Sequence, residues 1–193
     1  MESRLILVTG GARCGKSAYA ESLVKRYSGG REEIGAYLAT AKILDQEMAE
    51  RVGKHKCSRP QGWRTYEEPY WPCRAFSQAL EEGKRVMILD CLTMLTTNWL
   101  CRLSDPGAEQ LLQQSLLDEI LPPFQQLFEK AKDSQGATLI MVTNEVGWGI
   151  VPGDAFTRAF RDIAGRVNRL AAEYADEVWL VVAGQPLRIK PGQ

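Results

Sequence analysis

The chain has 193 residues, of which 45% are hydrophobic and 25% charged, a composition typical of an ordinary globular protein. Its 24 basic residues balance its 24 acidic residues, which argues against nucleic acid or an acidic membrane surface as a partner and requires any anionic ligand to be held locally. Five cysteines are scattered without a C-x-x-C pair and no apolar run approaches about 18 residues, so neither a disulfide framework, a zinc site nor a membrane span is indicated. We expect a single domain over residues 1–193 in the cytoplasm.

Residues 4–17, RLILVTGGARCGKS, begin with a strand pattern rather than a secretion signal. The apolar run at residues 5–8 is typical of a strand buried on both faces, and residues 18–24 suit a helix. Between them lies the motif G-x-x-x-x-G-K-[ST], whose fixed positions are Gly10, Gly15, Lys16 and Ser17. In this context the loop's backbone N–H groups would surround a polyphosphate, Lys16 would reach its outer phosphates and Ser17 would offer a hydroxyl to Mg²⁺. A glycine-rich turn matching by chance is the alternative, and the context disfavours it.

A second strand is predicted at residues 34–39. Its polar end is formed by Thr40, Ala41 and Lys42, where open parallel sheets place ligand groups. Asp45 is a candidate N-cap for a helix that runs to about residue 55. Residues 63–66 then predict a short strand, and Pro72 suits the first turn of a helix through residue 80.

Residues 85–90, RVMILD, predict the next buried strand, which ends in Asp90. A carboxylate at this place is what a phosphate-loop protein needs to hold Mg²⁺ together with Ser17. Taken alone, an aspartate at a strand end also fits a solvated turn residue. The combination with the phosphate loop favours the metal role.

Two helical patterns follow, at residues 92–103 and 108–132. We expect the second helix to bend or restart at Pro122 and Pro123, because proline lacks a backbone donor and clashes with the preceding turn.

Residues 137–143 predict another buried strand, with a polar end at Asn144 and Glu145. A glycine-rich loop over residues 147–153 leads to Asp154, a candidate N-cap for the longest predicted helix. A further strand and an edge strand are predicted at residues 177–183 and 187–189. Strands that alternate with helices predict an α/β fold with a mostly parallel sheet and helices on both faces.

His55 is the only histidine of the chain. On the predicted helix it shares a face with two apolar residues, which is typical of a partly buried packing residue. Its basic neighbours Lys54, Lys56 and Arg59 favour another role, because they would disfavour the imidazolium and leave a neutral nitrogen able to attack the α-phosphate of a nucleotide. The same basic residues also fit a solvated surface, so both interpretations remain open.

Five polar residues near the predicted loops are further candidates for ligand contacts. They are Asn144 and Glu145 at a strand end and Arg158, Arg161 and Arg166 on the last long helix. Each fits a strand terminus or a surface charge equally well. Trp148 in the glycine-rich loop fits either packing or a cover over a substrate.

Seven segments together carry a more specific pattern. They are GGARCGKS (10–17), LATAKILDQEMAERVGKHK (38–56), RP (59–60), WRTYE (63–67), ILDCLT (88–93), VTNEVGWGIVP (142–152) and RDIAGRVN (161–168). In this order they resemble the bifunctional adenosylcobinamide kinase / adenosylcobinamide-phosphate guanylyltransferase family of cobalamin biosynthesis. The resemblance implies a RecA-like, three-layer P-loop fold, often assembled as a homotrimer. It also implies two reactions: ATP or GTP phosphorylates the aminopropanol hydroxyl of adenosylcobinamide, and GMP is then transferred from GTP to the resulting phosphate, giving adenosylcobinamide-GDP and pyrophosphate.

The resemblance also assigns roles to residues. The family's guanylylated histidine matches His55, Lys16 is the second candidate catalytic residue, and Ser17 and Asp90 would hold Mg²⁺. The positions matched to nucleotide contacts are Gly10, Gly11, Ala12, Arg13, Cys14, Gly15, Lys16, Ser17, Thr40, Ala41, Lys42, Lys56, Cys57, Ser58, Arg59, Glu67 and Asp90. Two positions depart from the family pattern: Cys14 replaces a common serine, and Lys54 replaces a second histidine often found beside the reactive one.

Two other classes use the same phosphate loop. A nucleotide-dependent switch would explain residues 10–17 and Asp90 but not the basic residues around His55, and the strand end TNEVG lacks the N-K-x-D motif of GTPases. An ordinary small-molecule kinase would phosphorylate cobinamide without attaching a nucleotide.

Overall fold

The computed structural model describes residues 2–42, 46, 50, 53, 56, 59–103 and 113–191. In these ranges the strands are β1 (Arg4–Gly10), β2 (Gly35–Ala39), β3 (Arg64–Glu67), β4 (Val86–Asp90), β5 (Thr138–Val142), β6 (Glu177–Val182) and β7 (Gln185–Lys190). The helices are α1 (Lys16–Tyr27), α3 (Pro72–Glu81), α4 (Leu92–Leu103), α5 (Gln113–Asp133) and α6 (Ala155–Tyr174), with a 3₁₀ turn, η1 (Glu32–Ile34). Within the described ranges, the strands and helices follow the order that the sequence predicts.

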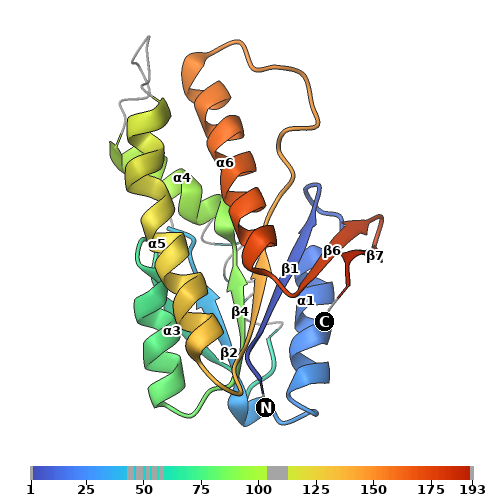
Figure 1. Cartoon of the computed structure of the whole chain (residues 1–193). Helices are drawn as coiled ribbons and strands as arrows, with labels where there is room; N and C mark the ends of the chain where they lie inside the picture. Colours follow the sequence, from blue (N-terminus) through green and yellow to red (C-terminus); the bar gives the residue numbers. More distant parts are fainter. Residues whose placement is uncertain are drawn as a thin grey trace.

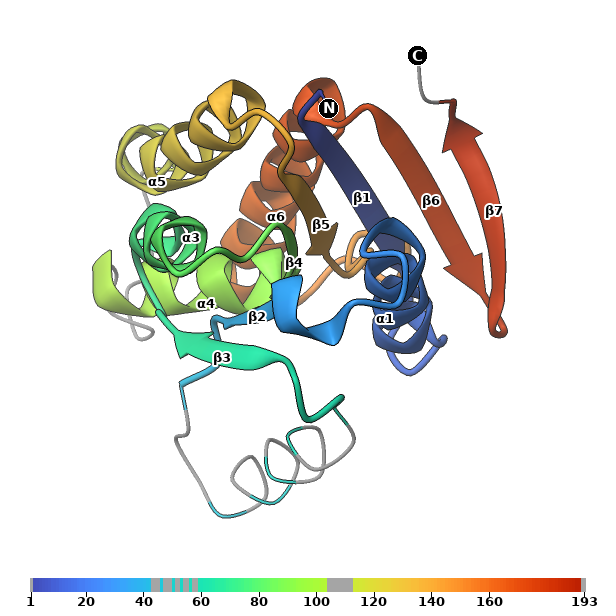
Figure 2. The same cartoon turned by 90° about the horizontal axis from the view of Figure 1, so that it is seen from below.

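The strands form one twisted sheet in the order β3-β2-β4-β5-β1-β6-β7 (Figure 2). All neighbours are parallel except β7, which pairs antiparallel with β6. The apolar runs β1, β4 and β5 lie in the middle of the sheet, where both faces are covered. The carboxyl ends of β1, β4 and β5 lie side by side at one edge of the sheet. Parallel sheets bind their ligands at this edge.

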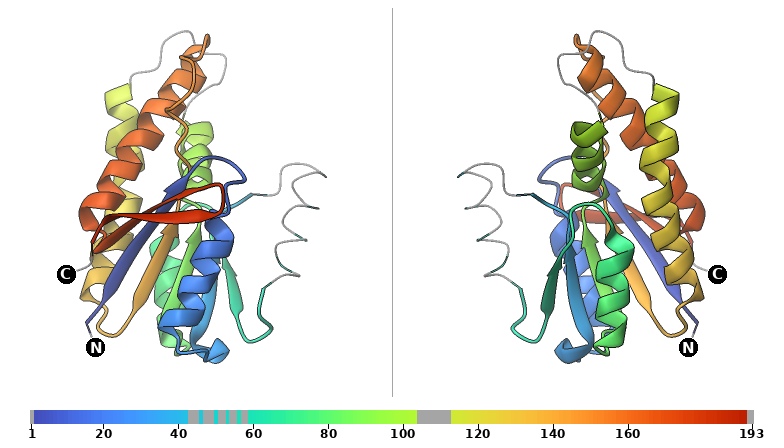
Figure 3. Two further views of the ribbon diagram at one scale, coloured as in Figure 1. Left: turned by 90° about the vertical axis from the view of Figure 1, so that its right-hand side faces the viewer. Right: turned by 90° about the vertical axis from the view of Figure 1, so that its left-hand side faces the viewer.

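Helices cover both faces of this sheet (Figures 1 and 3). Helix α1 lies on one face, and helices α3 to α6 lie on the other. Side chains of β1 alternate between the two faces: Leu5 and Leu7 join the larger core cluster, and Ile6 and Val8 join the cluster with α1. The predicted α/β fold with a mostly parallel sheet is confirmed.

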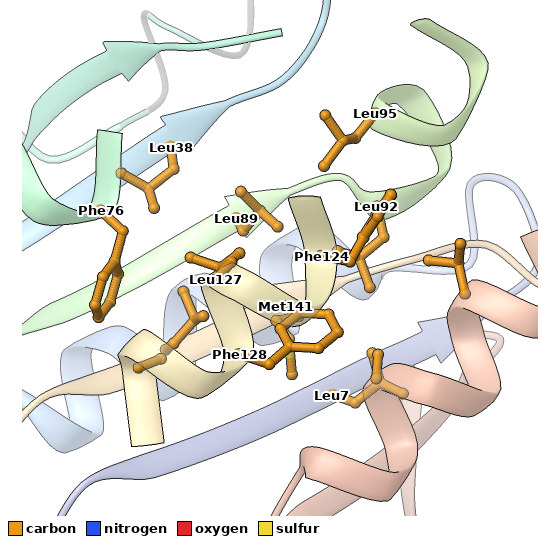
Figure 4. Close-up of a cluster of buried hydrophobic side chains, with 14 of the residues drawn as sticks. Leu7, Leu38, Phe76, Leu89, Leu92, Leu95, Phe124, Leu127, Phe128 and Met141 are labelled. Carbon is orange, nitrogen blue, oxygen red and sulfur yellow. The ribbon is translucent and has the colours of Figure 1, made fainter. Parts of the chain in front are cut away.

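The larger cluster is built from facing strands and helices, as Figure 4 shows. Phe124 and Phe128 of α5 and Leu92 of α4 are fully buried in it, together with Leu7 and Met141 of the sheet. Burying each such side chain stabilises the fold by about 1.5–3 kcal/mol. This packing fixes the strands whose ends carry the candidate site.

Local signals in the sequence account for several helix ends. Pro72 stands in the first turn of α3, and Asp154 caps α6 by accepting a hydrogen bond from the Thr157 amide at 2.7 Å. Of the bend or restart expected at Pro122 and Pro123, the structure excludes the restart, because α5 continues through both prolines as one helix. Its buried side chains keep helical spacing on both sides of the prolines, so packing on the core offsets the lost backbone hydrogen bonds.

Two predictions fall largely on undescribed residues. The helix expected from Asp45 to about residue 55 is described only at Gln46, Glu50 and Gly53, which are helical. The start of the helix predicted at residue 108 also lies outside the described residues. Within the described ranges, no helix is long and apolar enough to cross a membrane.

Candidate active site

The phosphate loop connects β1 to α1 at the carboxyl edge of the sheet, and its backbone shape requires glycine. Gly10 has φ 151° and Gly15 has φ 100°, values that side chains rarely allow. A Cβ at Gly10 would lie 2.4 Å from the carbonyl oxygen of Val181 on the neighbouring strand β6. The loop is further tied down by the Gly184 amide, which donates to the Cys14 carbonyl at 2.8 Å. The residues between the glycines, Gly11 to Arg13, face solvent, where a phosphate could approach.

Lys16 lies inside the curve of this loop rather than extending into solvent. Its side chain is buried, and Nζ donates to the Gly11 carbonyl at 2.5 Å and lies 3.7 Å from Cys14 Sγ. The backbone N–H groups of the loop and the N-terminal end of α1 carry partial positive charge, which adds to the charge of this ammonium. The arrangement therefore forms an anion site of the kind the motif predicts.

Ser17 and Asp90 come together from distant parts of the chain. Ser17 Oγ donates to Asp90 Oδ2 at 3.0 Å, and Tyr37 OH donates to the same oxygen at 2.7 Å. Burial, and next the Asp90 carboxylate itself, raise the pKa of Tyr37 far above its ordinary value, so the phenol stays a donor. A hydroxyl and a carboxylate beside a phosphate site are oxygen ligands that suit Mg²⁺. These residues thus fit the metal that the motif implies.

The candidate contacts at the end of β2 divide into buried and exposed side chains. Thr40 is buried, and its hydroxyl donates to the Cys91 carbonyl and accepts from the Cys91 amide, both at 2.8 Å. These two hydrogen bonds therefore hold the end of β2 against the segment that follows β4. Ala41 is half-buried, and the exposed Lys42 donates to Tyr70 OH at 3.0 Å, so these side chains do not converge on Lys16 in this structure.

Of the basic residues beyond the second strand that the structure describes, Arg59 contacts the site through Tyr37. The guanidinium carbon of Arg59 lies 3.3 Å from the centroid of the Tyr37 ring, and its Nη1 donates to Thr65 Oγ1 at 2.9 Å. Arg59 Nε is buried and has no hydrogen-bond partner among the described residues. Lys56 forms an ion pair with Glu67 at the end of β3. The candidates His55, Cys57 and Ser58 lie outside the described residues.

A second carboxylate lies beside the phosphate loop, at the end of β5. Glu145 Oε1 accepts from Thr9 Oγ1 at 2.6 Å and from Asn168 Nδ2 at 3.2 Å. The Glu145 amide donates to the Gly10 carbonyl at 3.1 Å, which ties this residue to the start of the loop. Sequence reasoning identified Glu145 as a candidate but missed its partners.

The remaining candidates do not join these groups. Arg158 donates to the Pro152 and Gly153 carbonyls of the preceding loop, and Arg161 pairs with its neighbour Asp162. Arg166 is exposed on α6. Trp148 is also exposed, at 71%, so packing does not explain it in this structure.

Tyr37, Asn168 and Thr9 donate hydrogen bonds to the candidate carboxylates Asp90 and Glu145, and the sequence did not single them out. Tyr37 is a hydroxyl-bearing residue within an apolar strand, and Asn168 is a polar residue on the buried face of α6. A polar side chain at a buried position of an otherwise apolar strand or helix face needs a hydrogen-bond partner, and this could have marked these residues in the sequence. The sequence could not name the partners, because they lie on other strands.

Proteins of known function resemble this chain over nearly its whole length. The bifunctional adenosylcobalamin biosynthesis protein CobU of Escherichia coli (strain K12) is 41% identical over 194 residues, with 96% of this chain and 99% of that protein covered. The protein of the same name from Salmonella typhimurium is 40% identical over 190 residues, again with 96% and 99% covered. The bifunctional adenosylcobalamin biosynthesis protein CobP of Pseudomonas aeruginosa is 36% identical over 189 residues, with 95% and 96% covered. The model of the cobinamide kinase / cobinamide phosphate guanyltransferase family matches residues 6–189, and the chain therefore belongs to this family.

Proposed function

We propose that this protein carries out both reactions of its family in the cytoplasm, as one domain over residues 1–193. It would phosphorylate adenosylcobinamide with ATP or GTP and then transfer GMP from GTP to the phosphate formed. The observation that carries the proposal is the meeting of Lys16, Ser17 and Asp90 at one loop, where Ser17 Oγ lies 3.0 Å from Asp90 Oδ2. A triphosphate and a metal ion require this combination of cation, hydroxyl and carboxylate.

In the first reaction the protein contributes mainly position and charge. Lys16 and the loop amides would hold the outer phosphates, while Ser17 and Asp90 would hold Mg²⁺. When bound, Mg²⁺ would neutralise part of the negative charge of the phosphates. Catalysis of phosphoryl transfer rests largely on such electrostatic stabilisation, since little covalent chemistry is left to the protein.

In the second reaction His55 would be the nucleophile. Its neutral nitrogen would attack the α-phosphate of GTP and pyrophosphate would leave, after which the phosphate of the substrate would displace the histidine. Two flanking basic residues support this role: Arg59 is stacked on Tyr37, whose hydroxyl binds Asp90, and Lys56 is paired with Glu67. Arg59, four residues beyond His55 in the sequence, therefore lies on the ring of Tyr37, whose hydroxyl contacts the carboxylate that we propose as a metal ligand.

The nucleotide contacts that we propose are those matched by family resemblance. They are residues 10–17, Thr40, Ala41, Lys42, Lys56, Cys57, Ser58, Arg59, Glu67 and Asp90. A homotrimer is also proposed from the resemblance, and the mass of the protein in solution, measured by light scattering, would test it.

Product analysis with adenosylcobinamide, GTP and Mg²⁺ tests the two reactions. We expect adenosylcobinamide-GDP. Adenosylcobinamide phosphate alone would indicate an ordinary kinase, and no product despite nucleotide binding would indicate a switch.

Labelling with GTP that carries ³²P at the α-phosphate tests the nucleophile. We expect acid-labile, alkali-stable label on the wild-type protein and none on His55→Ala, which should still phosphorylate adenosylcobinamide. Because His55 is the only histidine, no second imidazole can replace it. Label retained by His55→Ala would refute the assignment.

A further inference from the structure

The end of β5 lies between the two strands that supply the phosphate and metal groups. In the sheet β5 pairs with β1, which leads into the phosphate loop, and with β4, which ends in Asp90. Val142, the last residue of β5, stands opposite both Val8 and Asp90. Figure 1 shows the chain continuing from β5 above this edge of the sheet toward α6. Glu145 follows three residues after Val142, and its amide donates to the Gly10 carbonyl at 3.1 Å, so it lies beside the start of the phosphate loop.

Hydrogen bonds fix the direction of the Glu145 carboxylate. Oε1 accepts from Thr9 Oγ1 at 2.6 Å and from Asn168 Nδ2 at 3.2 Å. The Asn168 amide is itself oriented, because its Oδ1 accepts from Thr143 Oγ1 at 2.6 Å. In the part of the chain that the structure describes, no donor contacts the other oxygen, Oε2. One carboxylate oxygen is thus held while the second remains available.

The surroundings of Glu145 differ from those of a structural ion pair. Among the described residues, no lysine or arginine pairs with it, and its side chain is half-buried rather than covered. The residues that follow, from Gly147 to Val151, are exposed, so a large substrate can approach from this side. A fixed carboxylate with one open oxygen at a phosphate site suits proton transfer.

We propose that Glu145 is the general base of the phosphorylation step, an inference that rests on the proposed kinase function. The hydroxyl oxygen of adenosylcobinamide forms a bond to the γ-phosphorus, and its proton moves to Glu145 Oε2. The bond between the γ-phosphorus and the β,γ-bridging oxygen breaks, and the nucleoside diphosphate leaves with the electron pair. Thr9 and Asn168 are positioning residues that aim the carboxylate. The guanylyl transfer has a phosphate as acceptor, with no hydroxyl proton to remove, so it does not need this base.

The two half-reactions separate this role from a structural one. Glu145→Gln keeps the shape of the side chain and an oxygen acceptor for Thr9 and Asn168 but cannot take a proton. We expect its kcat for phosphorylation to fall about 10²-fold or more, with the KM for nucleotide changed by less than about threefold. Guanylyl transfer to adenosylcobinamide phosphate, supplied directly, should fall far less.

Control variants make the outcome decisive. Glu119→Gln removes the same charge from an exposed position of α5, a helix that contributes no residue to the candidate site, and should retain both reactions. If Glu145→Gln does not fold, judged by thermal unfolding, Thr9→Val replaces it and should reduce phosphorylation about tenfold by releasing the carboxylate.

The proposal is overturned if a folded Glu145→Gln phosphorylates adenosylcobinamide within about threefold of wild type, or if both reactions fall equally. A wild-type protein that cannot phosphorylate adenosylcobinamide would instead refute the proposed function itself.

Discussion

The ends of the neighbouring strands β4 and β5 each carry a carboxylate, and the two are held differently. Asp90 accepts hydrogen bonds from Ser17, at the start of α1, and from Tyr37, so it lies beside the phosphate loop. Glu145 accepts from Thr9 and Asn168. This difference in hydrogen-bond donors, rather than in residue type, is the basis on which we propose a metal role for Asp90 and a proton-transfer role for Glu145.

The chain also leaves the two strands in different directions. After Asp90 it returns directly to the core, where Cys91 and Leu92 are buried. After Glu145 it passes into solvent, where Trp148 and Ile150 are 71% and 96% exposed. The end of β4 is therefore a closed region and the end of β5 an open one, as expected if the metal is held at the first and the large substrate arrives at the second.

Asp90→Asn should have the largest effect. Both reactions would need the metal-bound nucleotide, so both kcat values should fall roughly 10²- to 10³-fold because charge stabilisation at the phosphates is lost. Rate measurements on each half-reaction, with Mg²⁺ titrated, check this. A loss confined to phosphorylation would contradict the division of roles between Asp90 and Glu145.

Tyr37→Phe should have an intermediate effect. The variant removes the hydroxyl that orients Asp90 but keeps the ring under Arg59, so we expect about a tenfold loss of activity and a higher requirement for Mg²⁺. The lost hydrogen bond should also lower the free energy of unfolding by about 1–2 kcal/mol. Full activity at limiting Mg²⁺ would show that Tyr37 does not position the carboxylate.

The stability difference between wild type and Tyr37→Phe should depend on pH. The pKa of Tyr37 is raised in the folded protein, so its contribution is complete below the ordinary tyrosine pKa of about 10 and declines as the pH rises above it. Denaturant unfolding between neutral pH and about pH 11 measures this. A difference that grows with pH would contradict the assigned direction of the shift.

Cysteine reactivity should give the smallest change and tests whether the chain that follows β4 is enclosed. Burial raises the pKa of Cys91 to about 12, so this thiol should resist alkylation, whereas the half-buried Cys14 should react and should be protected by nucleotide. Cys14→Ser should alter kcat by less than about twofold, because the loop acts through its backbone. Mass spectrometry of alkylated peptides distinguishes the two thiols, and modification of Cys91 in the folded protein would contradict its enclosure.

Several features were determined by the sequence alone. The glycine spacing and Lys16 define the phosphate loop because backbone geometry is local, and the apolar runs define β1, β4 and β5 because a strand covered on both faces needs apolar residues throughout. The proline in the first turn of α3 and the aspartate that caps α6 could also be predicted, because these signals are local as well.

Only the tertiary structure decided which side chains meet. The sequence could place Asp90 at a strand end, but the tertiary structure brings Ser17 and Tyr37 to the same Asp90 oxygen and places β5, which Glu145 follows, between β1 and β4. It also decided that α5 runs through its two prolines, because the buried face of that helix outweighs a local preference. Contacts between distant segments depend on how whole elements pack, and no local pattern encodes them.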